Sequence, residues 1–352
     1  METCVFCQSN IPIHDKGVLI IQGKIEAINK IIEVGSTIDD VKVEQLNKKE
    51  LVFSYQVQSQ LDMLAVEIEK KLFRFKDEEV LGAVLQERKD VHIRSFVPLK
   101  QLINRIKNPD MVQIIQDQLF TSHIQPIIST VGETVYGYEF LLRPKRIDFS
   151  PGALFSFAQK SGLQSKLDSV ARINAIRTSS KLLPNGTKRF INFLPSSIYN
   201  PEHCLQSTFY AVEQYNVNPD DLIFEVVETE KIEDMAHLKN IFYHYQKSGM
   251  KVALDDIGAG FSTIDVLKEL KPDYAKIDRK VIMDCYKDET KMKKIKELHV
   301  TAKENGIYLL AEGIEAKEEW EFLKEYVDFG QGYFFGRPAE KPIGMQNVDG
   351  GL

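Results

Sequence analysis

The feature that most constrains the fold is a regular alternation of short apolar stretches with amphipathic helical stretches between residues 124 and 333. The first two apolar stretches are separated only by Val131-Gly132-Glu133, so they predict an antiparallel pair of strands. The later stretches alternate with helices and predict a parallel sheet. The predicted strands are 124–130, 134–142, 189–193, 222–226, 251–254, 273–277, 307–311 and 327–333. This pattern fits an α/β fold, a TIM-like (β/α)8 barrel with an antiparallel first strand.

Polar side chains recur at or near the ends of these predicted strands. Groups at the carboxyl ends of barrel strands project into one shared mouth. Any one of them alone is more often a structural polar group, but their joint occurrence favours a common site. The seven residues are Glu139, Asn192, Glu225, Asp255, Lys276, Glu312 and Gln331.

The stretch KVALDDIGAGFS places two adjacent acids at the end of a buried strand. Asp255 and Asp256 follow the apolar run 252–254 and precede Gly258 and Gly260. Burying paired carboxylates is costly unless a cation neutralises them, so the stretch predicts a metal site. The alternative is that the Asp pair caps a following helix at Ser262, since Asp and Gly are ordinary loop formers.

The predicted polar set suits a particular chemistry. Carboxylates and a carboxamide oxygen are hard ligands that favour Mg²⁺ or Mn²⁺. Two such ions that share a bridging carboxylate can activate a water and clamp phosphoryl oxygens, as phosphodiester hydrolysis requires. Lys276 would hold or deprotonate that water, or would stabilise developing charge. The alternative for Lys276 is a salt bridge to Asp278.

Composition narrows the class of protein. The chain has 352 residues, a net charge of −6 and a pI near 5.8, which argues against binding to duplex nucleic acid through its phosphates. No apolar run is long enough to span a bilayer, and residues 1–17 lack the features of a signal peptide. Four cysteines agree with a reducing compartment. We therefore expect a cytoplasmic location without membrane insertion.

The first 107 residues predict a small α/β domain, which we interpret as regulatory. Strands are expected at 18–21, 51–55 and 91–93, and helices at 57–72 and 77–86. Asn108-Pro109-Asp110 is typical of a helix start, which places a boundary between domains 1–107 and 108–352.

Cys4 and Cys7 form a CxxC pair near the start of the chain. Neither Cys204 nor Cys285 belongs to a second CxxC that would complete a zinc site. Ordinary small residues near a strand are the favoured interpretation; the alternatives are metal or redox use of the pair, including a metal site shared across a dimer.

Residues 108–340 contain a series of motifs, namely QPI at Gln125, YEFLLRP at Tyr138, FINFLPSSI at Phe190, FEVVE at Phe224, LDDIGAGFS at Leu254, KPDYAKID at Lys271, AEGIE at Ala311 and QGYFFGRP at Gln331. Through these motifs the region resembles the EAL-type cyclic-di-GMP phosphodiesterases. The resemblance implies metal-dependent hydrolysis of the bacterial second messenger cyclic-di-GMP to linear pGpG. It also implies a homodimer formed through the barrel.

The resemblance assigns roles to individual residues. It implies two metal ions, Mg²⁺ or Mn²⁺, one held by Glu139, Asn192, Glu225 and Asp255, and the other by Asp255, Asp256 and Glu312. Lys276 matches the lysine that contacts the catalytic water. Glu139, Asp255, Asp256 and Glu312 are thus expected to be catalytic together with Lys276. Gln125, Arg143, Gln331 and Pro338 are expected to bind substrate, with Arg143 on a phosphate.

The loop after the paired acids is expected to be braced by Glu228 and shaped by Gly258 and Gly260. By the resemblance, this loop couples metal occupancy to dimerisation. Four positions depart from the family pattern: Phe140, Ile257, Ala259 and Ala316. None of them removes a metal ligand. Ala259 puts the order of the loop in doubt, and Phe140 is expected to alter packing beside the pocket.

Two other functions are compatible with the sequence. A degenerate member of the family would bind cyclic-di-GMP and signal, through the first domain or a partner, without cutting it. A third possibility is a barrel that only scaffolds partner proteins. Degenerate relatives usually lose the signature glutamate, a metal carboxylate or the lysine, and all of these are present here. Hydrolysis is therefore favoured.

Overall fold

The computed structural model describes residues 14–72, 79–87, 96–145, 148–226, 234–258 and 264–343. The chain forms two compact units. The first runs to Phe120 and includes Pro144–Leu167, and the second consists of Thr121–Arg143 and the chain from Asp168 onwards. Cys4 and Cys7 lie outside the described residues.

The first unit contains a five-stranded sheet in the order β2-β3-β1-β4-β5, in which each neighbouring pair is antiparallel. Leu19 and Ile21 of β1 are 1% and 0% exposed and belong to a core that also contains the buried residues of helices α1, α2 and α3. The order of elements up to β4 is the split βαβ arrangement of ferredoxin-like folds. The elements are β1 (Gly17–Gly23), α1 (Ile25–Ile31), η1 (Ile32–Thr37), β2 (Lys42–Asn47), β3 (Glu50–Tyr55), α2 (Gln58–Leu72), β4 (Val80–Leu85), β5 (Val97–Pro98) and α3 (Leu99–Ile106).

The helix predicted at 77–86 is wrong, because β4 occupies Val80–Leu85 and pairs with β1. Leu81, Ala83 and Leu85 are compatible with either structure, and pairing with a buried central strand overrides a local preference for helix. The strand predicted at 91–93 lies outside the described residues.

The helix start at Asn108-Pro109-Asp110 is confirmed by α4 (Pro109–Gln116), with the proline in its first turn. Asn108 does not cap this helix, because its amide donates instead to the Asn104 carbonyl at 2.8 Å. Within the first unit, Arg105 of α3 donates to the Ser161 carbonyl at 2.7 Å, in the turn between α5 (Pro151–Lys160) and α6 (Gln164–Leu182). A boundary at residue 107 stays a prediction.

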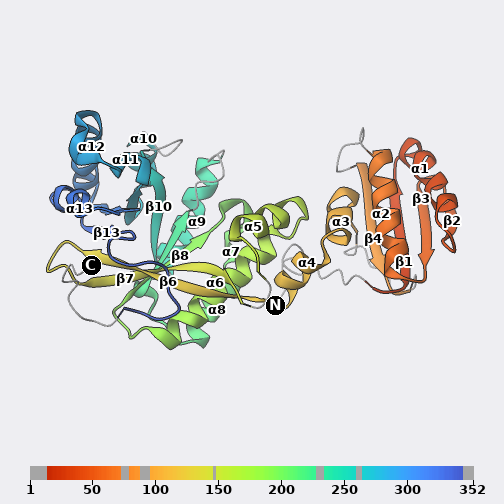
Figure 1. Cartoon of the computed structure of the whole chain (residues 1–352), viewed down its shortest axis with the longest axis horizontal. Helices are drawn as coiled ribbons and strands as arrows, with labels where there is room; N and C mark the ends of the chain where they lie inside the picture. Colours follow the sequence, from red (N-terminus) through yellow and green to blue (C-terminus); the bar gives the residue numbers. More distant parts are fainter. Residues whose placement is uncertain are drawn as a thin grey trace. The chain divides into compact units, whose positions relative to one another are not determined.

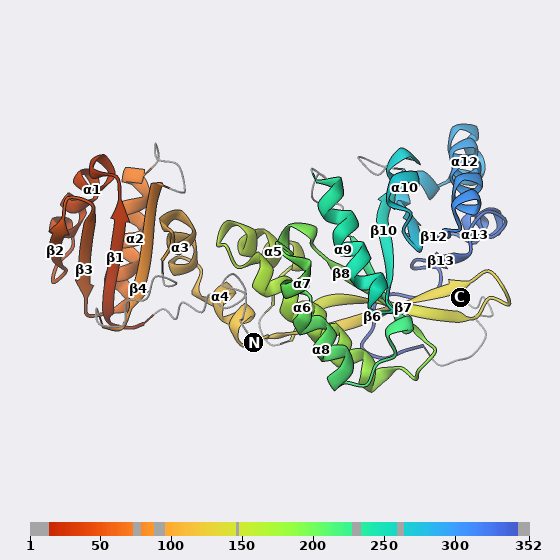
Figure 2. The ribbon, with the colours of Figure 1, turned by 180° about the vertical axis from the view of Figure 1, so that it is seen from behind.

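The second unit contains a closed barrel in the order β10-β11-β12-β13-β6-β7-β8-β9. The pair β13–β6 is antiparallel, whereas the neighbouring pairs from β7 to β13 are parallel, which confirms the TIM-like barrel with an antiparallel first strand. Figures 1 and 2 show β6 and β7 running together as a long hairpin. The strands are β6 (Phe120–Ser129), β7 (Val135–Pro144), β8 (Lys188–Phe193), β9 (Leu222–Val226), β10 (Lys251–Ile257), β11 (Tyr274–Ile277), β12 (Tyr308–Ala311) and β13 (Phe329–Gln331).

Helices and short 3-10 turns connect the barrel strands. They include η5 (Pro195–Ser197), α7 (Pro201–Cys204), α8 (Gln206–Gln214), η6 (Pro219–Asp221), α9 (Met235–Lys247), α10 (Ile264–Leu270), α11 (Arg279–Ile282), η7 (Cys285–Lys287), α12 (Glu289–Asn305) and α13 (Lys317–Leu323). Among the described residues, none of the helices has both the length and the apolar character needed to cross a membrane.

An apolar layer, which we call the barrel floor, fills the barrel interior. Its members are Ile127, Phe190, Ile223, Ala253, Tyr274, Leu310 and Phe329, with Tyr136 packed against them. Tyr136 stacks on Phe329 with ring centroids 4.0 Å apart, and its hydroxyl lies 2.6 Å from that of Tyr274. Because side chains two apart in a strand point to the same face, the residues two positions further along these strands also face inward. The floor therefore fixes where the next layer of side chains lies.

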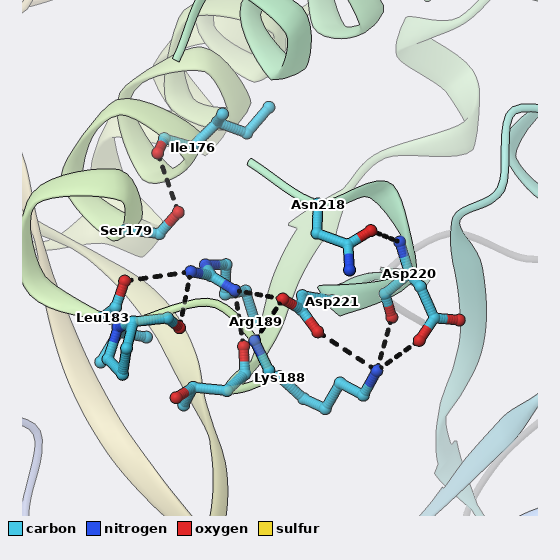
Figure 3. Close-up of polar contacts among 11 residues, drawn as sticks. Ile176, Ser179, Leu183, Lys188, Arg189, Asn218, Asp220 and Asp221 are labelled. Atoms are coloured by element: carbon cyan, nitrogen blue, oxygen red, sulfur yellow. Dashed lines mark hydrogen bonds and ion pairs between the residues drawn. The ribbon is translucent and has the colours of Figure 1, made fainter. Parts of the chain in front are cut away.

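A cluster of polar side chains links the amino ends of β8 and β9 (Figure 3). Asp221 is buried and accepts from Arg189 Nη1 at 3.2 Å and from the Gly186 amide at 2.7 Å. Lys188 Nζ lies 2.7 Å from Asp220 Oδ2 and 3.3 Å from Asp221 Oδ1. In barrels of this type, groups at the amino ends of the strands contribute to stability.

Candidate functional site

The seven polar residues predicted at strand ends come together at the carboxyl end of the barrel. Six of them follow a residue of the barrel floor by two positions, as Asn192 follows Phe190 and Glu225 follows Ile223. The parallel register places Asn192 opposite Glu225. The site is therefore a polar layer that lies directly on the apolar floor.

Lys276 on β11 lies at the centre of this layer and is 1% exposed. Its ammonium lies 2.5 Å from Glu225 Oε2 and 3.4 Å from Asp255 Oδ1, and it also pairs with Glu312. Burial lowers the pKa of Lys276, but the surrounding carboxylates outweigh it and hold the pKa well above its ordinary value. The alternative of a bridge to Asp278 is wrong, because Asp278 caps α11 by accepting from the Lys280 amide at 2.6 Å.

Glu225 on β9 is completely buried. Burial raises its pKa well above the ordinary value, and the nearby Glu139 and Asp255 add to this, while Lys276 opposes it. Its second oxygen, Oε1, is buried without a hydrogen-bond partner. A buried carboxylate oxygen without a partner destabilises the folded state unless a cation or a hydrogen-bond donor binds it.

Asp255, Asp256 and Glu312 each offer a carboxylate oxygen within 4.8 Å of the other two. Burial raises the pKa of Asp255, and burial together with the nearby Asp255 carboxylate raises the pKa of Glu312 well above its ordinary value. Asp256 has a left-handed backbone with φ +53°, and its amide donates to Asp255 Oδ1 at 2.9 Å. That uncommon conformation ends the regular alternation of β10, so adjacent residues can both serve one site.

Glu139 on β7 is held by two amides. Asn192 Nδ2 donates to its Oε1 at 2.9 Å, and Gln331 Nε2 donates to its Oε2 at 2.7 Å. Burial opposes ionisation, but Lys276, the two amides and Arg143 lower the pKa of Glu139 below its ordinary value. Glu139 therefore stays ionised where Glu225 and Glu312 are more easily protonated.

The residues expected to bind substrate lie around this cluster. Gln331 Nε2 also lies 3.1 Å from Gln125 Oε1, and Gln125 donates to the Gly336 carbonyl at 3.1 Å. Pro338, which is half-buried, lies beside the middle of β6, because its neighbour Ala339 forms a bridge with Ile124. Arg143 shares the Glu139 face of β7 and donates to the carbonyl of Leu142 at 2.8 Å.

The loop after β10 is only partly described. Gly258 has φ +91°, a backbone conformation that favours glycine, and its carbonyl accepts from Lys294 of α12. Glu228, Ala259 and Gly260 lie outside the described residues. Ile257 is buried, and Phe140 is buried on the face of β7 opposite to Glu139. Phe140 therefore packs behind the strand, away from the polar layer.

One contact beside Glu312 was missed by sequence reasoning. Arg279, at the start of α11, donates to the Gly313 carbonyl and lies 2.8 Å from Glu315 through its Nη2. Gly313 has φ +69°, and a Cβ at this position would meet the Arg279 side chain at 2.9 Å. The glycine in AEGIE carried a signal for such a close approach, but the identity of the neighbour depends on tertiary structure.

The fold and the site define a class of protein, and the comparisons with known proteins agree. The model of the EAL domain matches residues 110–338, so the chain belongs to the EAL domain family. Family membership, the TIM-like barrel and the placement of the polar layer are thus mutually consistent.

Individual relatives extend the comparison. The chain is 31% identical over 259 residues to the probable cyclic di-GMP phosphodiesterase PdeG of Escherichia coli K12, covering 68% of this chain and 49% of PdeG. The chain therefore spans about half the length of that curated relative. A standalone EAL protein of Vibrio cholerae O395, solved with c-di-GMP bound, is 31% identical with a TM-score of 0.58, covering 63% of this chain and 93% of that one.

A second solved structure matches a longer part of the chain. BlrP1 of Klebsiella pneumoniae, in a complex with calcium and cyclic-di-GMP, covers 92% of this chain and 96% of its own with a TM-score of 0.59. At 20% identity, this likeness concerns the fold alone.

Proposed function

We propose that this chain hydrolyses cyclic-di-GMP to linear pGpG, using two divalent cations at the carboxyl end of the barrel. The observation that carries the proposal is a polar layer of five carboxylates and Asn192, in which three of the carboxylates pair with one buried lysine and Glu225 Oε1 is left without a hydrogen-bond partner. The named function of relatives such as PdeG supports the choice of substrate.

The residues present fit divalent cations. The buried orphan oxygen of Glu225 and the close triad of Asp255, Asp256 and Glu312 are hard oxygen donors, which suit Mg²⁺ or Mn²⁺. Glu139, Asn192, Glu225 and Asp255 would hold one ion, and Asp255, Asp256 and Glu312 the other. When bound, the ions supply an acidified water and neutralise phosphoryl charge. The complexes of BlrP1 with calcium or manganese support this assignment.

The protein's own groups would orient the reaction. Lys276 presents an ammonium to the centre of the carboxylate layer, where it can donate a hydrogen bond to the attacking water and stabilise negative charge. Arg143 shares the inward face with Glu139, where a guanidinium can bind a phosphate through two parallel hydrogen bonds. Gln331 bridges Glu139 and Gln125, which would hold both amides in a fixed orientation beside the bound nucleotide.

We further propose that residues 1–107 regulate this activity and that the barrel forms a homodimer. Gly258 and the loop around it, held from α12 by Lys294, would link the site to that interface. Size-exclusion chromatography with light scattering tests the dimer.

The decisive experiment incubates the purified full chain with cyclic-di-GMP and either Mg²⁺ or Mn²⁺ and separates the products by chromatography. Linear pGpG that forms only when a cation is present supports the proposal. Binding of cyclic-di-GMP without turnover in either metal would leave a receptor. If cyclic-di-GMP does not raise the Tm, both hydrolysis and a receptor role are excluded, because a ligand that binds the native state must raise its apparent stability.

A further inference from the structure

A buried ion pair on α6 lies outside the polar layer and was not anticipated from the sequence. Arg172 Nη2 lies 3.1 Å from Asp168 Oδ2, and the two side chains are 2% and 3% exposed. A buried pair is weak evidence for stability, because desolvation offsets much of the attraction. The role of the pair is therefore better judged from the other groups that Asp168 and Arg172 contact.

The Asp168 end of the pair holds the chain just beyond β8. Its Oδ1 accepts from the Leu194 amide at 2.9 Å, and its Oδ2 accepts from the Ser197 hydroxyl at 2.5 Å. Leu194 lies two residues after Asn192, whose amide donates to Glu139. Asp168 thus fixes the backbone at the point where Asn192 enters the site.

The Arg172 end reaches β9 through an aromatic ring. Arg172 Nη1 donates to the Tyr245 hydroxyl at 3.0 Å. The Tyr245 ring stacks on Phe224 with centroids 4.1 Å apart and meets Phe193 edge-on at 5.4 Å. Phe224 directly precedes Glu225, and Phe193 directly follows Asn192. The Asp168–Arg172 pair is therefore linked to the residues next to Asn192 on β8 and Glu225 on β9.

We propose that the Asp168–Arg172 pair is a positioning device that sets Asn192 and Glu225 against Glu139 and so determines the affinity of the site for divalent cations. The inference rests on the proposed metal site. Asp168 is a positioning residue, since its carboxylate is engaged by Leu194, Ser197 and Arg172 and acts on the site through them. Residues that orient ligands from behind commonly change metal affinity by about 10-fold to 100-fold when they are replaced.

The chain offers a matched control at the opposite end of the same two strands. Asp221 is also buried, also pairs with an arginine and also accepts from a backbone amide, but at the amino ends of β8 and β9 (Figure 3). Asp221→Asn removes the same charge from an equally buried carboxylate. It should cost stability without moving the carboxyl ends of the strands.

The test is titration calorimetry of the full chain with MnCl₂, together with thermal unfolding of each variant. Asp168→Asn should raise the dissociation constant for Mn²⁺ by about 10-fold or more, whereas Asp221→Asn should stay within about 2-fold of wild type despite a similar loss of Tm. Ser197→Ala, which removes one hydroxyl, should weaken Mn²⁺ binding by about 3-fold with little change in Tm.

Wild-type affinity for Mn²⁺ in both Asp168→Asn and Ser197→Ala would overturn the inference, and so would an equal loss of affinity in Asp221→Asn. If Asp168→Asn does not fold, Ser197→Ala decides the question. Suppose that the wild type hydrolyses cyclic-di-GMP and binds Mn²⁺, and that the variants bind Mn²⁺ with the same affinity. This result refutes only the positioning role and leaves the proposed function intact. A wild type that binds no Mn²⁺ refutes the proposed metal site, and this inference with it.

Discussion

Lys276 Nζ lies 2.5 Å from Glu225 Oε2, and the two side chains are 1% and 0% exposed. The pair is surrounded by further acids, so the lysine offsets only part of the negative charge. A cluster with more carboxylates than cations at such burial is stable only if protons or further cations compensate. This imbalance leads to predictions about charge, metal and pH.

Replacing the bridging acid should separate binding from turnover. Asp255→Asn keeps the shape of the side chain but removes a charge and a strong oxygen ligand. Hydrolysis of cyclic-di-GMP should fall by about 100-fold or more, while nucleotide binding should suffer less because Arg143 does not depend on this carboxylate. Product chromatography and calorimetry measure the two effects. Wild-type turnover at saturating metal would refute the assignment.

Removing the central lysine should give a variant that depends on metal for stability. Lys276→Ala leaves Glu225, Asp255 and Glu312 without their shared partner, and breaking a buried pair commonly costs about 3–5 kcal/mol. Turnover should fall by about 100-fold or more. Thermal unfolding with EDTA and with Mn²⁺ should show a larger metal-induced rise in Tm than in wild type. An equal rise in both proteins would argue against a charge-balancing role.

The metal-free protein should lose stability as pH rises. The folded state holds the pKa of Glu225 well above its ordinary value of 4.5, so it keeps a proton that the unfolded chain releases. The resulting stabilisation is complete below that ordinary value and is lost as pH rises through the raised pKa. The raised pKa of Lys276 acts only in the alkaline range, above 10.5. Scanning calorimetry with EDTA between about pH 5 and pH 8 should show a falling Tm.

Glu225→Gln provides the control for this pH effect, because glutamine does not titrate. Its Tm should depend less on pH than that of wild type over the same range. A Tm that falls equally in both proteins would assign the effect to other groups.

The first 105 residues should not be needed for binding. Every proposed site residue lies beyond residue 108, so a protein of residues 106–352 should still bind cyclic-di-GMP. Its stability should be lower, because removal of Arg105 leaves the Ser161 carbonyl without its 2.7 Å donor. A folded, soluble product that shows no nucleotide binding in calorimetry would place part of the pocket in the first domain.

The CxxC pair should be dispensable. Replacing Cys4 and Cys7 by serine should leave folding and hydrolysis within about 2-fold of wild type, because the sequence offers no second thiol pair to complete a tetrahedral zinc site. Metal analysis of the purified protein checks this directly. Stoichiometric zinc in wild type that is lost from the double variant, together with stability, would show the opposite.

The barrel strands could be predicted because buried parallel strands are short apolar runs, as in residues 222–224 at the start of β9. The polar layer could be predicted because six of the strands carry, at or near their carboxyl ends, a polar residue that has the same inward orientation as the floor residue two positions before it. The family resemblance then assigned roles that spacing alone left open. Sequence and structure agree wherever one local pattern determines the outcome.

What could not be predicted depends on contacts between distant segments. Asp168 and Leu194 are 26 residues apart, and Arg172 and Tyr245 are 73 apart, so no local pattern announces their pairing. The strand at Val80–Leu85 was predicted as a helix because its register against β1 is a tertiary property. The left-handed backbone of Asp256 was likewise invisible, since aspartate adopts it only where neighbouring structure requires it.

The barrel floor has a consequence for how molecules move through the site. The floor residues Phe190, Tyr274 and Phe329 are 0–6% exposed and fill the interior of the barrel below the polar layer. The barrel is therefore closed at this level and has no channel running through it. A ligand that enters at the carboxyl end must leave by the same opening. Under the proposed function, substrate and product would therefore use the same opening. Accumulated product would then inhibit the entry of further substrate.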